Sequence, residues 1–191
     1  GRFLEQLDEN PRGRETYIML VSDHGWHLGE KKHWCKGAIW EQTTHIPFIV
    51  RGPGVKAGST CTQPVSLIDV YPSLVDFAGL EVPAWLDGTS VKPQLADPKS
   101  TRPPVISSYG EANTAIRTER WRYIRYANGD EELYDHDTDP MEWNNVAGSE
   151  EHARLKKQMA EWIPKREAEN APVADRYKKK RPKKKRARPG A

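Results

Sequence analysis

The feature that most constrains the fold is the stretch from Tyr17 to Lys36, which reads YIMLVSDHGWHLGEKKHWCK. Its first residues, 17–21, form a continuous apolar run, as expected for a strand covered by helices on both faces. The sequence SDHG follows at once, and a polar loop with two more histidines, a Cys and a Lys comes next. Ligand-binding side chains of α/β sheets gather at the carboxyl ends of strands. The stretch therefore predicts an α/β sheet that delivers polar ligands to its rim.

Further elements extend this prediction along the first half of the chain. Residues 2–8 read as the end of a helix, before the strand. His45–Val50 is a second apolar run, and Pro47 inside it favours an edge strand or a late start. Val65–Leu80 has helical periodicity. The order strand, loop, strand, helix is typical of part of an α/β domain, which we place at residues 1–100.

The second half of the chain predicts a different architecture. Asp87–Pro104 is rich in Pro, Gly, Asp and Ser, which marks a linker. Four short runs separated by turn residues then predict a small antiparallel meander. Ser149–Ile163 has an apolar face that includes Trp162 and predicts a packing helix. We place this sheet-and-helix subdomain at residues 101–165. The four runs are Val105–Tyr109, Thr114–Arg117, Trp121–Tyr126 and Glu132–Tyr134.

The charge of the chain is polarised. Residues 176–188 hold ten Lys and Arg and no acid, whereas the rest of the chain carries 20 basic and 27 acidic residues, a net charge of −7. Because residues 166–191 lack apolar periodicity, we predict a disordered basic tail there. Such a tail could contact a polyanion, either nucleic acid, an anionic membrane surface or a sulfated polysaccharide, or it could serve solubility alone. No apolar run approaches the length of a membrane span.

Asp23 and His24 are candidate ligands of a divalent cation. An ionised Asp suits calcium or magnesium, and an imidazole nitrogen suits zinc better. The alternative is a capped turn, in which Asp23 bonds the backbone and His24 is merely exposed.

Lys36 is the candidate anion-binding residue. It lies between Trp34 and Trp40 in the sequence, and their rings could enclose a desolvated ammonium that acts as a fixed positive charge on an oxyanion. The alternative is a solvated surface lysine, which is the state we expect for its neighbours Lys31 and Lys32.

These residues lie in a segment with a strong family resemblance. The segment SDHGWHLGEKKHWCKGAIWEQTTHIPFIVRGPGV closely resembles the second signature region of the sulfatases, which belong to the alkaline-phosphatase-like superfamily. Within that family it is most similar to the iduronate-2-sulfatase and choline-sulfatase branch, with its pattern SDHG-x-x-LGE-x-x-x-W-x-K. The resemblance covers about residues 1–165 and implies the C-terminal part of an enzyme that hydrolyses sulfate esters. It continues in the family's order through VSLIDVYPSLVDFAGL, LDGTSVKP, AIRTERWRYIRY and ELYDHDTDPMEWNNVA.

The resemblance also implies roles for three residues. Asp23 and His24 would be two ligands of a divalent cation, usually calcium, and Lys36 would bind the sulfate group. The substrate would be a sulfated small molecule or a sulfated polysaccharide, and the family's usual location is secreted or periplasmic. The nearby polar residues that stay unassigned, with ordinary loop or helix polarity favoured for each, are His27, His33, Glu41 and His45.

The chain departs from the family in its nucleophile. The family uses a Cys or Ser in the motif C/S-x-P-x-R, oxidised to formylglycine, but Cys35 is followed by KGA and Cys61 by TQP. The pair of aspartates near the family's N-terminus is also absent, although calcium takes about six to eight ligands. The chain begins without Met, inside a predicted helix. We therefore expect a fragment that has no turnover on its own.

Two other functions compete with the sulfatase interpretation. A phosphoester or phosphonate ester hydrolase of the same superfamily also uses Asp-His metal ligands and a fixed cation, and the upstream nucleophile would separate the two. A non-catalytic polyanion-binding protein would combine a decayed half-domain with the basic tail. Stabilisation of the chain by calcium that is abolished in Asp23→Ala would favour a retained metal site.

Overall fold

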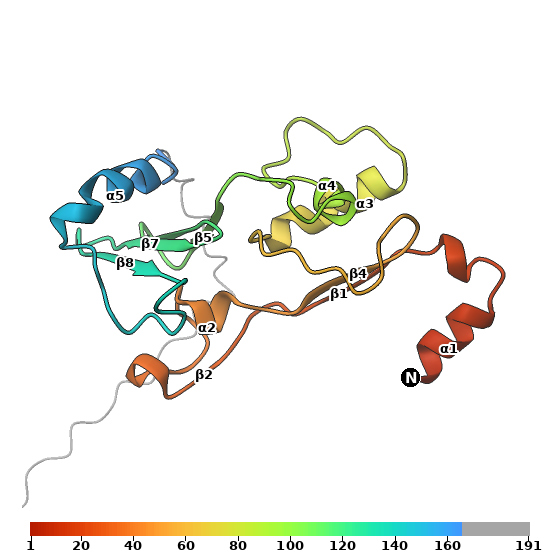
Figure 1. Ribbon diagram of the computed structural model, residues 1–191, viewed down its shortest axis with the longest axis horizontal. Helices are drawn as coiled ribbons and strands as arrows, with labels where there is room; N and C mark the ends of the chain where they lie inside the picture. Colours follow the sequence, from red (N-terminus) through yellow and green to blue (C-terminus); the bar gives the residue numbers. More distant parts are fainter. Residues whose placement is uncertain (166–191) are drawn as a thin grey trace, which may run out of the picture.

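The computed structural model of the chain describes residues 1–165. The predicted tail, from residue 166 onward, lies outside the described residues. Figure 1 shows an elongated arrangement, with a four-stranded sheet under α5 at one end, a two-stranded sheet in the middle and α1 (Arg2–Glu9) at the other end. The helix expected at residues 2–8 is therefore confirmed. None of the helices within the described residues is long and apolar enough to cross a membrane.

The predicted antiparallel meander is confirmed. Its strands pair in the order β5-β6-β7-β8, and every neighbouring pair is antiparallel. In this register Ile116 lies opposite Tyr123, which in turn lies opposite Leu133, and all three side chains are fully buried. They form the main core of the described residues. The strands span β5 Val105–Ser108, β6 Thr114–Arg117, β7 Trp121–Arg125 and β8 Glu131–Asp135.

The packing helix lies over one face of this sheet, as Figure 1 shows. It begins as a 3-10 turn, η4 (Glu150–His152), and continues as α5 (Ala153–Ala160). Met159 and Ile163 enter the core with Ile116 and its neighbours. Trp162 was expected on the same face, but it is 46% exposed. The reason is that α5 ends at Ala160, so the helical spacing that would turn Trp162 inward is already lost.

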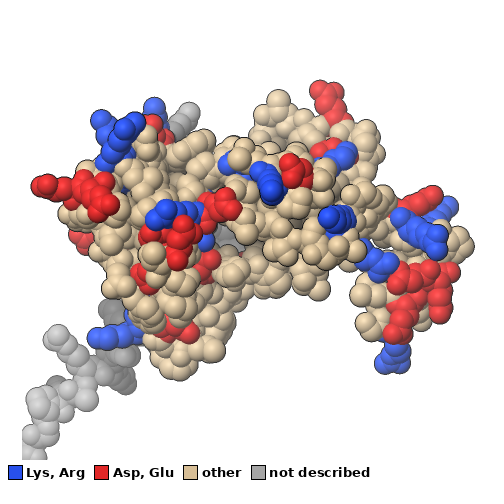
Figure 2. Space-filling model, in the orientation of Figure 1, with Lys and Arg blue, Asp and Glu red and all other residues tan. Residues whose placement is uncertain are grey.

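The two apolar runs of the first half form an antiparallel pair of strands, β1 (Ile18–Val21) and β4 (Phe48–Arg51). β4 starts directly after Pro47, as the sequence predicts. The expectation that β1 is covered on both faces is wrong for the described residues. Leu20 and Ile49 lie opposite each other and are 54% and 59% exposed, because no element in residues 1–165 packs over them. Figure 2 shows a densely charged α1 at one end, whereas the middle of the molecule carries far fewer charges.

The predicted helix at 65–80 consists of a 3-10 turn, η3 (Leu67–Asp69), followed by α3 (Val70–Phe77). Ser66 and Asp69 form a capping box at its start. Gly79 ends it at a φ of 70°, a left-handed conformation that favours glycine. Tyr17 stacks on Phe77 with ring centroids 4.3 Å apart, which joins α3 to the β1 strand.

The predicted linker contains a short helix that sequence analysis missed. This helix, α4 (Lys92–Ala96), carries Pro93 in its first turn, where proline is tolerated. Its start is tied to α3, since the Val91 amide donates to Ser73 Oγ at 2.9 Å. A composition of Pro, Gly, Asp and Ser does not separate a loop from so short a helix. The remaining elements are η1 Gly13–Glu15, β2 His27–Leu28, η2 Glu30–Lys32, β3 Trp34–Cys35 and α2 Glu41–Thr44.

Candidate functional site

The turn after β1 presents an imidazole in a defined state. Ser22 Oγ donates to the carbonyl of His24 at 2.9 Å, which folds the turn back on itself. His24 Nδ1 lies 2.8 Å from the carbonyl of Gly25. A carbonyl can only accept, so Nδ1 donates to it and Nε2 is the ring nitrogen that can accept a hydrogen bond. The turn therefore fixes the orientation of the His24 ring.

All three residues predicted for the site come together. Lys36 Nζ lies 2.9 Å from His24 Nε2, and Asp23 Oδ2 lies 3.6 Å from the same nitrogen. The short β2–β3 hairpin brings Lys36 back to the turn, since His27 pairs with Cys35 in its register. The Asp23 side chain is 83% exposed. The site is thus an open cluster of a carboxylate, an imidazole and an ammonium.

This donor set fits a divalent cation in part. Calcium contacts its ligand atoms at about 2.3–2.6 Å, so one ion can touch two atoms that are 3.6 Å apart, the separation of Asp23 Oδ2 and His24 Nε2. These two residues supply two ligands of the about six to eight that calcium takes. The others would have to come from water, substrate or residues outside the described part of the chain.

Lys36 does not occupy the expected aromatic enclosure. It is exposed, and Trp34 beside it is 65% exposed. The enclosed lysine is instead Lys31, whose Nζ lies 5.1 Å from the Trp40 ring centroid and 4.3 Å from that of Tyr134, and donates to Tyr134 Oη at 2.9 Å. Burial lowers the pKa of Lys31, and the charge of a nearby glutamate, Glu132, opposes this shift. The expectation of a solvated Lys31 is therefore wrong. Its partner Tyr134 lies 103 positions away, so the residues next to Lys31 in the sequence give no sign of the enclosure.

The turn rests directly against α2. The amide of Gly25 donates to the carbonyl of Thr43 at 2.9 Å, and the amide of Trp26 donates to that of Gln42 at 2.8 Å. A Cβ atom at Gly25 would lie 2.1 Å from the Gln42 carbonyl oxygen, so this contact requires glycine. The position of Asp23 and His24 therefore depends on the position of α2.

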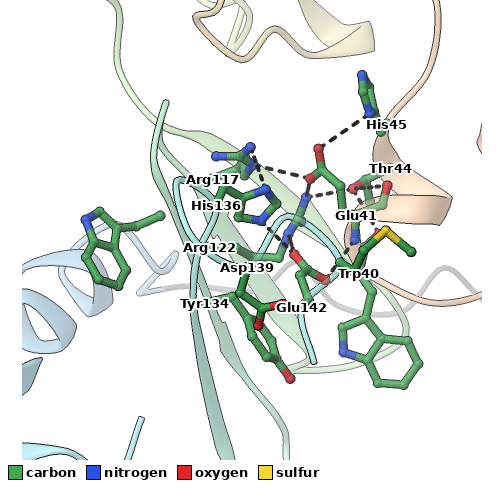
Figure 3. Close-up of polar contacts among 12 residues, drawn as sticks. Trp40, Glu41, Thr44, His45, Arg117, Arg122, Tyr134, His136, Asp139 and Glu142 are labelled. Carbon is green, nitrogen blue, oxygen red and sulfur yellow. Dashed lines mark hydrogen bonds and ion pairs between the residues drawn. The ribbon is translucent and has the colours of Figure 1, made fainter. Parts of the chain in front are cut away.

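A buried ionic network lies on the other side of α2 (Figure 3). Arg122 from β7 reaches the Glu41 carboxylate, and its Nε lies 2.5 Å from Glu142 Oε1. His136 Nε2 lies 3.0 Å from the same Glu142 oxygen, and Arg117 Nε lies 3.3 Å from Glu41 Oε2. Burial opposes the ionisation of Glu41, but Arg122 and Arg117 outweigh it and lower its pKa to about 2. We call these five residues the Arg122 network.

Three members of the Arg122 network resemble a metal site. Glu41, His136 and Glu142 form the one group of three potential ligands within 4.8 Å of one another that residues 1–165 contain. However, the guanidinium groups of Arg117 and Arg122 already neutralise the carboxylates. A divalent cation would face two fixed positive charges there, so we assign the group a structural role. Sequence analysis left Glu41 open and missed its partners, which lie 76 to 101 positions away.

The other histidines near the site differ in their surroundings. His27 is fully buried, and its ring lies edge-on to those of His33 and Trp40 at centroid distances of 5.2 and 5.8 Å. Burial and the neighbouring His33 lower the pKa of His27. His27 is therefore part of the packing of the described residues, which differs from the ordinary loop polarity favoured for it. The side chain of His45 is 76% exposed, with Nδ1 3.6 Å from Glu41 Oε1.

Comparison with known proteins places the chain in a family. Residues 29–169 match the family model described as N-sulphoglucosamine sulphohydrolase, C-terminal. The chain is 36% identical over 150 residues to a sulfatase of Formosa agariphila and 35% identical over 154 residues to a choline-sulfatase of Rhizobium meliloti. These matches cover 78% and 77% of the chain but 30% of each relative. The chain thus spans about a third of the length of these relatives.

Solved structures show the same likeness. One is a protein in complex with its substrate D-glucosamine-2-N,6-O-disulfate, with a TM-score of 0.72 and 33% identity over 84% of this chain and 36% of that chain. Another is the phosphonate monoester hydrolase of Agrobacterium radiobacter, with a TM-score of 0.68 and 29% identity over 84% and 36% of the two chains. The fold of the described residues is therefore that of the C-terminal region of alkaline-phosphatase-like sulfatases.

Proposed function

Because the chain belongs to the sulfatase family, through the C-terminal region that its family model describes, we propose that it supplies the cation-binding and sulfate-binding part of a sulfuric ester hydrolase. The observation that supports this most directly is the juxtaposition of His24 with Asp23 and Lys36 at the end of β1. Three residue types suited to a metal sulfate-ester complex meet there, although Lys36 lies 12 positions from His24.

In this proposal Asp23 and His24 would hold the cation, and calcium is the ion we favour. When bound, the cation would supply positive charge against the oxygens of a sulfate group. The hydrogen bond from His24 Nδ1 to the Gly25 carbonyl orients the ring and leaves Nε2 as the nitrogen that would face such an ion. Lys36 would add a second positive charge on the same side and bind a sulfate oxygen.

The group that attacks sulfur is not among these residues. Neither cysteine stands in a C-x-P-x-R motif, and no serine does. We therefore expect the 191 residues alone to show no turnover of a sulfate ester. The substrate class we propose is a sulfated saccharide or another small sulfate ester, of the kind that the iduronate-2-sulfatase and choline-sulfatase branch hydrolyses. This is supported by the choline-sulfatase relative and by the neighbour bound to a disulfated glucosamine.

A phosphonate or phosphoester hydrolase is the second candidate. It is supported by the likeness to the phosphonate monoester hydrolase of Agrobacterium radiobacter. A bound cation and a lysine would stabilise the negative oxygens of a tetrahedral phosphonate in the same way as those of a sulfate. The non-catalytic alternative, polyanion binding through the basic tail, predicts instead steeply salt-dependent binding to heparin that is lost when residues 176–191 are deleted.

Terbium luminescence tests the cation site. Terbium replaces calcium in oxygen-rich sites, and an excited indole close by sensitises its emission. The Trp26 ring lies 5.9 Å from the His24 ring, so a bound terbium ion would lie close to it. We expect sensitised emission that calcium displaces, that is lost in Asp23→Asn, and that is dimmed in Trp26→Phe while calcium still competes.

Two matched variants complete the experiment. Asp87→Asn removes another exposed carboxylate, outside the site, and should keep the emission. In the presence of calcium we expect inorganic sulfate to raise the melting temperature of wild type. Lys36→Met should keep the terbium signal but lose this stabilisation by sulfate. Emission from Asp23→Asn equal to that of wild type, or no emission from wild type, would overturn the proposed site.

A further inference from the structure

The helix that supports the candidate site cannot hold itself in place. α2 comprises four residues, and its N-cap residue, Trp40, makes no side-chain capping bond. A single helical turn is unstable in isolation, because its nucleation fixes several backbone angles for one hydrogen bond. Yet this turn provides the carbonyls of Gln42 and Thr43 that fix the backbone of Gly25 and Trp26. Its position must be set from outside.

One buried guanidinium sets it. Arg122 donates from Nη1 to the carbonyl of Ile39 at 3.0 Å and from Nη2 to Thr44 Oγ1 at 2.9 Å, and it also reaches the Glu41 carboxylate. A single side chain therefore touches the residue before the N-cap, the first residue and the last residue of α2. Because the guanidinium is planar and rigid, these contacts fix both the position of α2 along its axis and its rotation about that axis. Arg122 is 2% exposed and lies in a central strand of the meander, so its own position is fixed.

Glu142 completes the clamp. Its Oε2 accepts the amide of Glu41 at 3.0 Å, which satisfies a free donor at the start of α2. Its Oε1 contacts both Arg122 and His136. Glu142 is fully buried, so neither carboxylate oxygen gains a partner from solvent. Figure 3 shows Arg122 from β7, and His136 and Glu142 from the segment after β8, gathered beside Glu41 of α2.

We propose that Arg122 and Glu142 are positioning residues for the candidate cation site. They hold α2 against the meander, and α2 holds the turn that carries Asp23 and His24. The small C-terminal sheet thus sets the geometry of ligands that lie about 100 positions upstream, without touching the ion. This inference rests on the proposed function for its consequence, the ion affinity, but the contacts that carry it are independent of that function.

Conservative variants test the clamp. Arg122→Lys keeps the charge but loses the fork, and Thr44→Val removes the hydroxyl that accepts from Arg122 Nη2 while it keeps the side-chain shape. We expect each to weaken terbium affinity, by about 10-fold to 100-fold for Arg122→Lys, as for other residues that orient metal ligands. We also expect faster hydrogen exchange at the amides of Gly25 and Trp26. If Arg122→Lys does not fold, Thr44→Val still tests the contact between Arg122 and α2.

The control variant is Lys156→Met. It breaks an ion pair with Glu131 on the same sheet, where Lys156 lies 2.7 Å from Oε2, but it touches no part of α2. We expect it to lower stability with no change in terbium affinity or in exchange at Gly25 and Trp26. Wild-type affinity and exchange in both Arg122→Lys and Thr44→Val would overturn the clamp and leave the proposed function standing. Faster exchange in the variants of a chain that binds no terbium would support the clamp and overturn the proposed function.

Discussion

Two lysines five positions apart in this chain differ in their surroundings, since one is enclosed by aromatic rings and the other is exposed to solvent. Lys31 is enclosed by the rings of Trp40 and Tyr134, where a desolvated ammonium gains from the aromatic faces. Lys36 is exposed and contacts the His24 imidazole. The enclosed lysine fastens the β2–β3 hairpin to the meander, and the exposed one stays available to an anion. At this scale it is the surroundings, and not the residue type, that decide the role.

The contribution of Glu41 to the free energy of unfolding should depend on pH in a defined direction. A carboxyl whose pKa falls on folding stabilises the folded state above its unfolded pKa, and this stabilisation is lost as the pH falls toward the folded pKa. For Glu41 the two values are 4.5 and about 2. We therefore expect the gap in free energy of unfolding between wild type and Glu41→Gln to shrink by about 2–3 kcal/mol between pH 5 and pH 2.

Urea denaturation at a series of pH values measures this gap. Glu111→Gln is the matched control, because Glu111 is exposed and its carboxylate makes no ion pair with the described residues. This variant removes a carboxylate without breaking an ion pair, so it reports the effect of losing one negative charge. A gap for Glu41→Gln that stays constant from pH 5 to pH 2 would contradict the ionic role of Glu41.

At the scale of elements, the site depends on contacts between pieces too short to stand alone. β2 and β3 have two residues each, and α2 has four. None of them has a hydrophobic face large enough to fix its place. Their positions come from backbone hydrogen bonds between the turn and α2 and from the Arg122 network beneath. The functional loop is therefore ordered by its neighbours rather than by its own propensity.

Gly25→Ala tests the contact between the turn and α2. The added Cβ would lie 2.1 Å from the Gln42 carbonyl oxygen, so the turn must move away from the helix. We expect a loss of stability of about 1–3 kcal/mol, as for other overpacked positions, together with the loss of terbium emission. Gly148→Ala is the control, because no heavy atom lies within 4 Å of its Cβ position. Unchanged melting and emission in Gly25→Ala would contradict the close contact.

At the scale of the whole molecule, the two halves of the described chain differ in how they are packed. The meander and α5 enclose a core of fully buried residues, including Ile116, Tyr123 and Leu133. The β1–β4 pair has one half-buried face, and its other face exposes Leu20 and Ile49. An exposed apolar face on a strand pair with free edges favours association.

Leu20→Thr combined with Ile49→Thr should therefore reduce self-association. Thr is accepted in strands, and these positions lose little buried apolar area, so we expect the melting temperature to change by less than about 2 °C. Sedimentation velocity and a thermal melt measure the two effects. Ile116→Thr, which places a hydroxyl in the core, should lower the melting temperature clearly. A similar decrease in the melting temperature of the double variant would contradict the prediction, because it would mean that Leu20 and Ile49 are buried within the chain.

The sequence by itself determined the elements whose signals are local. The apolar run of β1, the polar turn at its end, the helical periodicity of α3 and the short strands of the meander all follow from neighbouring residues, because backbone propensity and periodicity act over a few positions. The three residues of the candidate site also share one short stretch.

Only the tertiary structure decided which lysine is enclosed, which face of β1 stays exposed, and what holds α2. Tyr134 lies 103 positions from Lys31, and Glu142 lies 101 positions from Glu41. The buried ion pair between Arg122 and Glu41, 81 positions apart, likewise leaves no periodic trace in the sequence, because each partner alone reads as an ordinary charged side chain. Its existence depends on the fold that removes both partners from water.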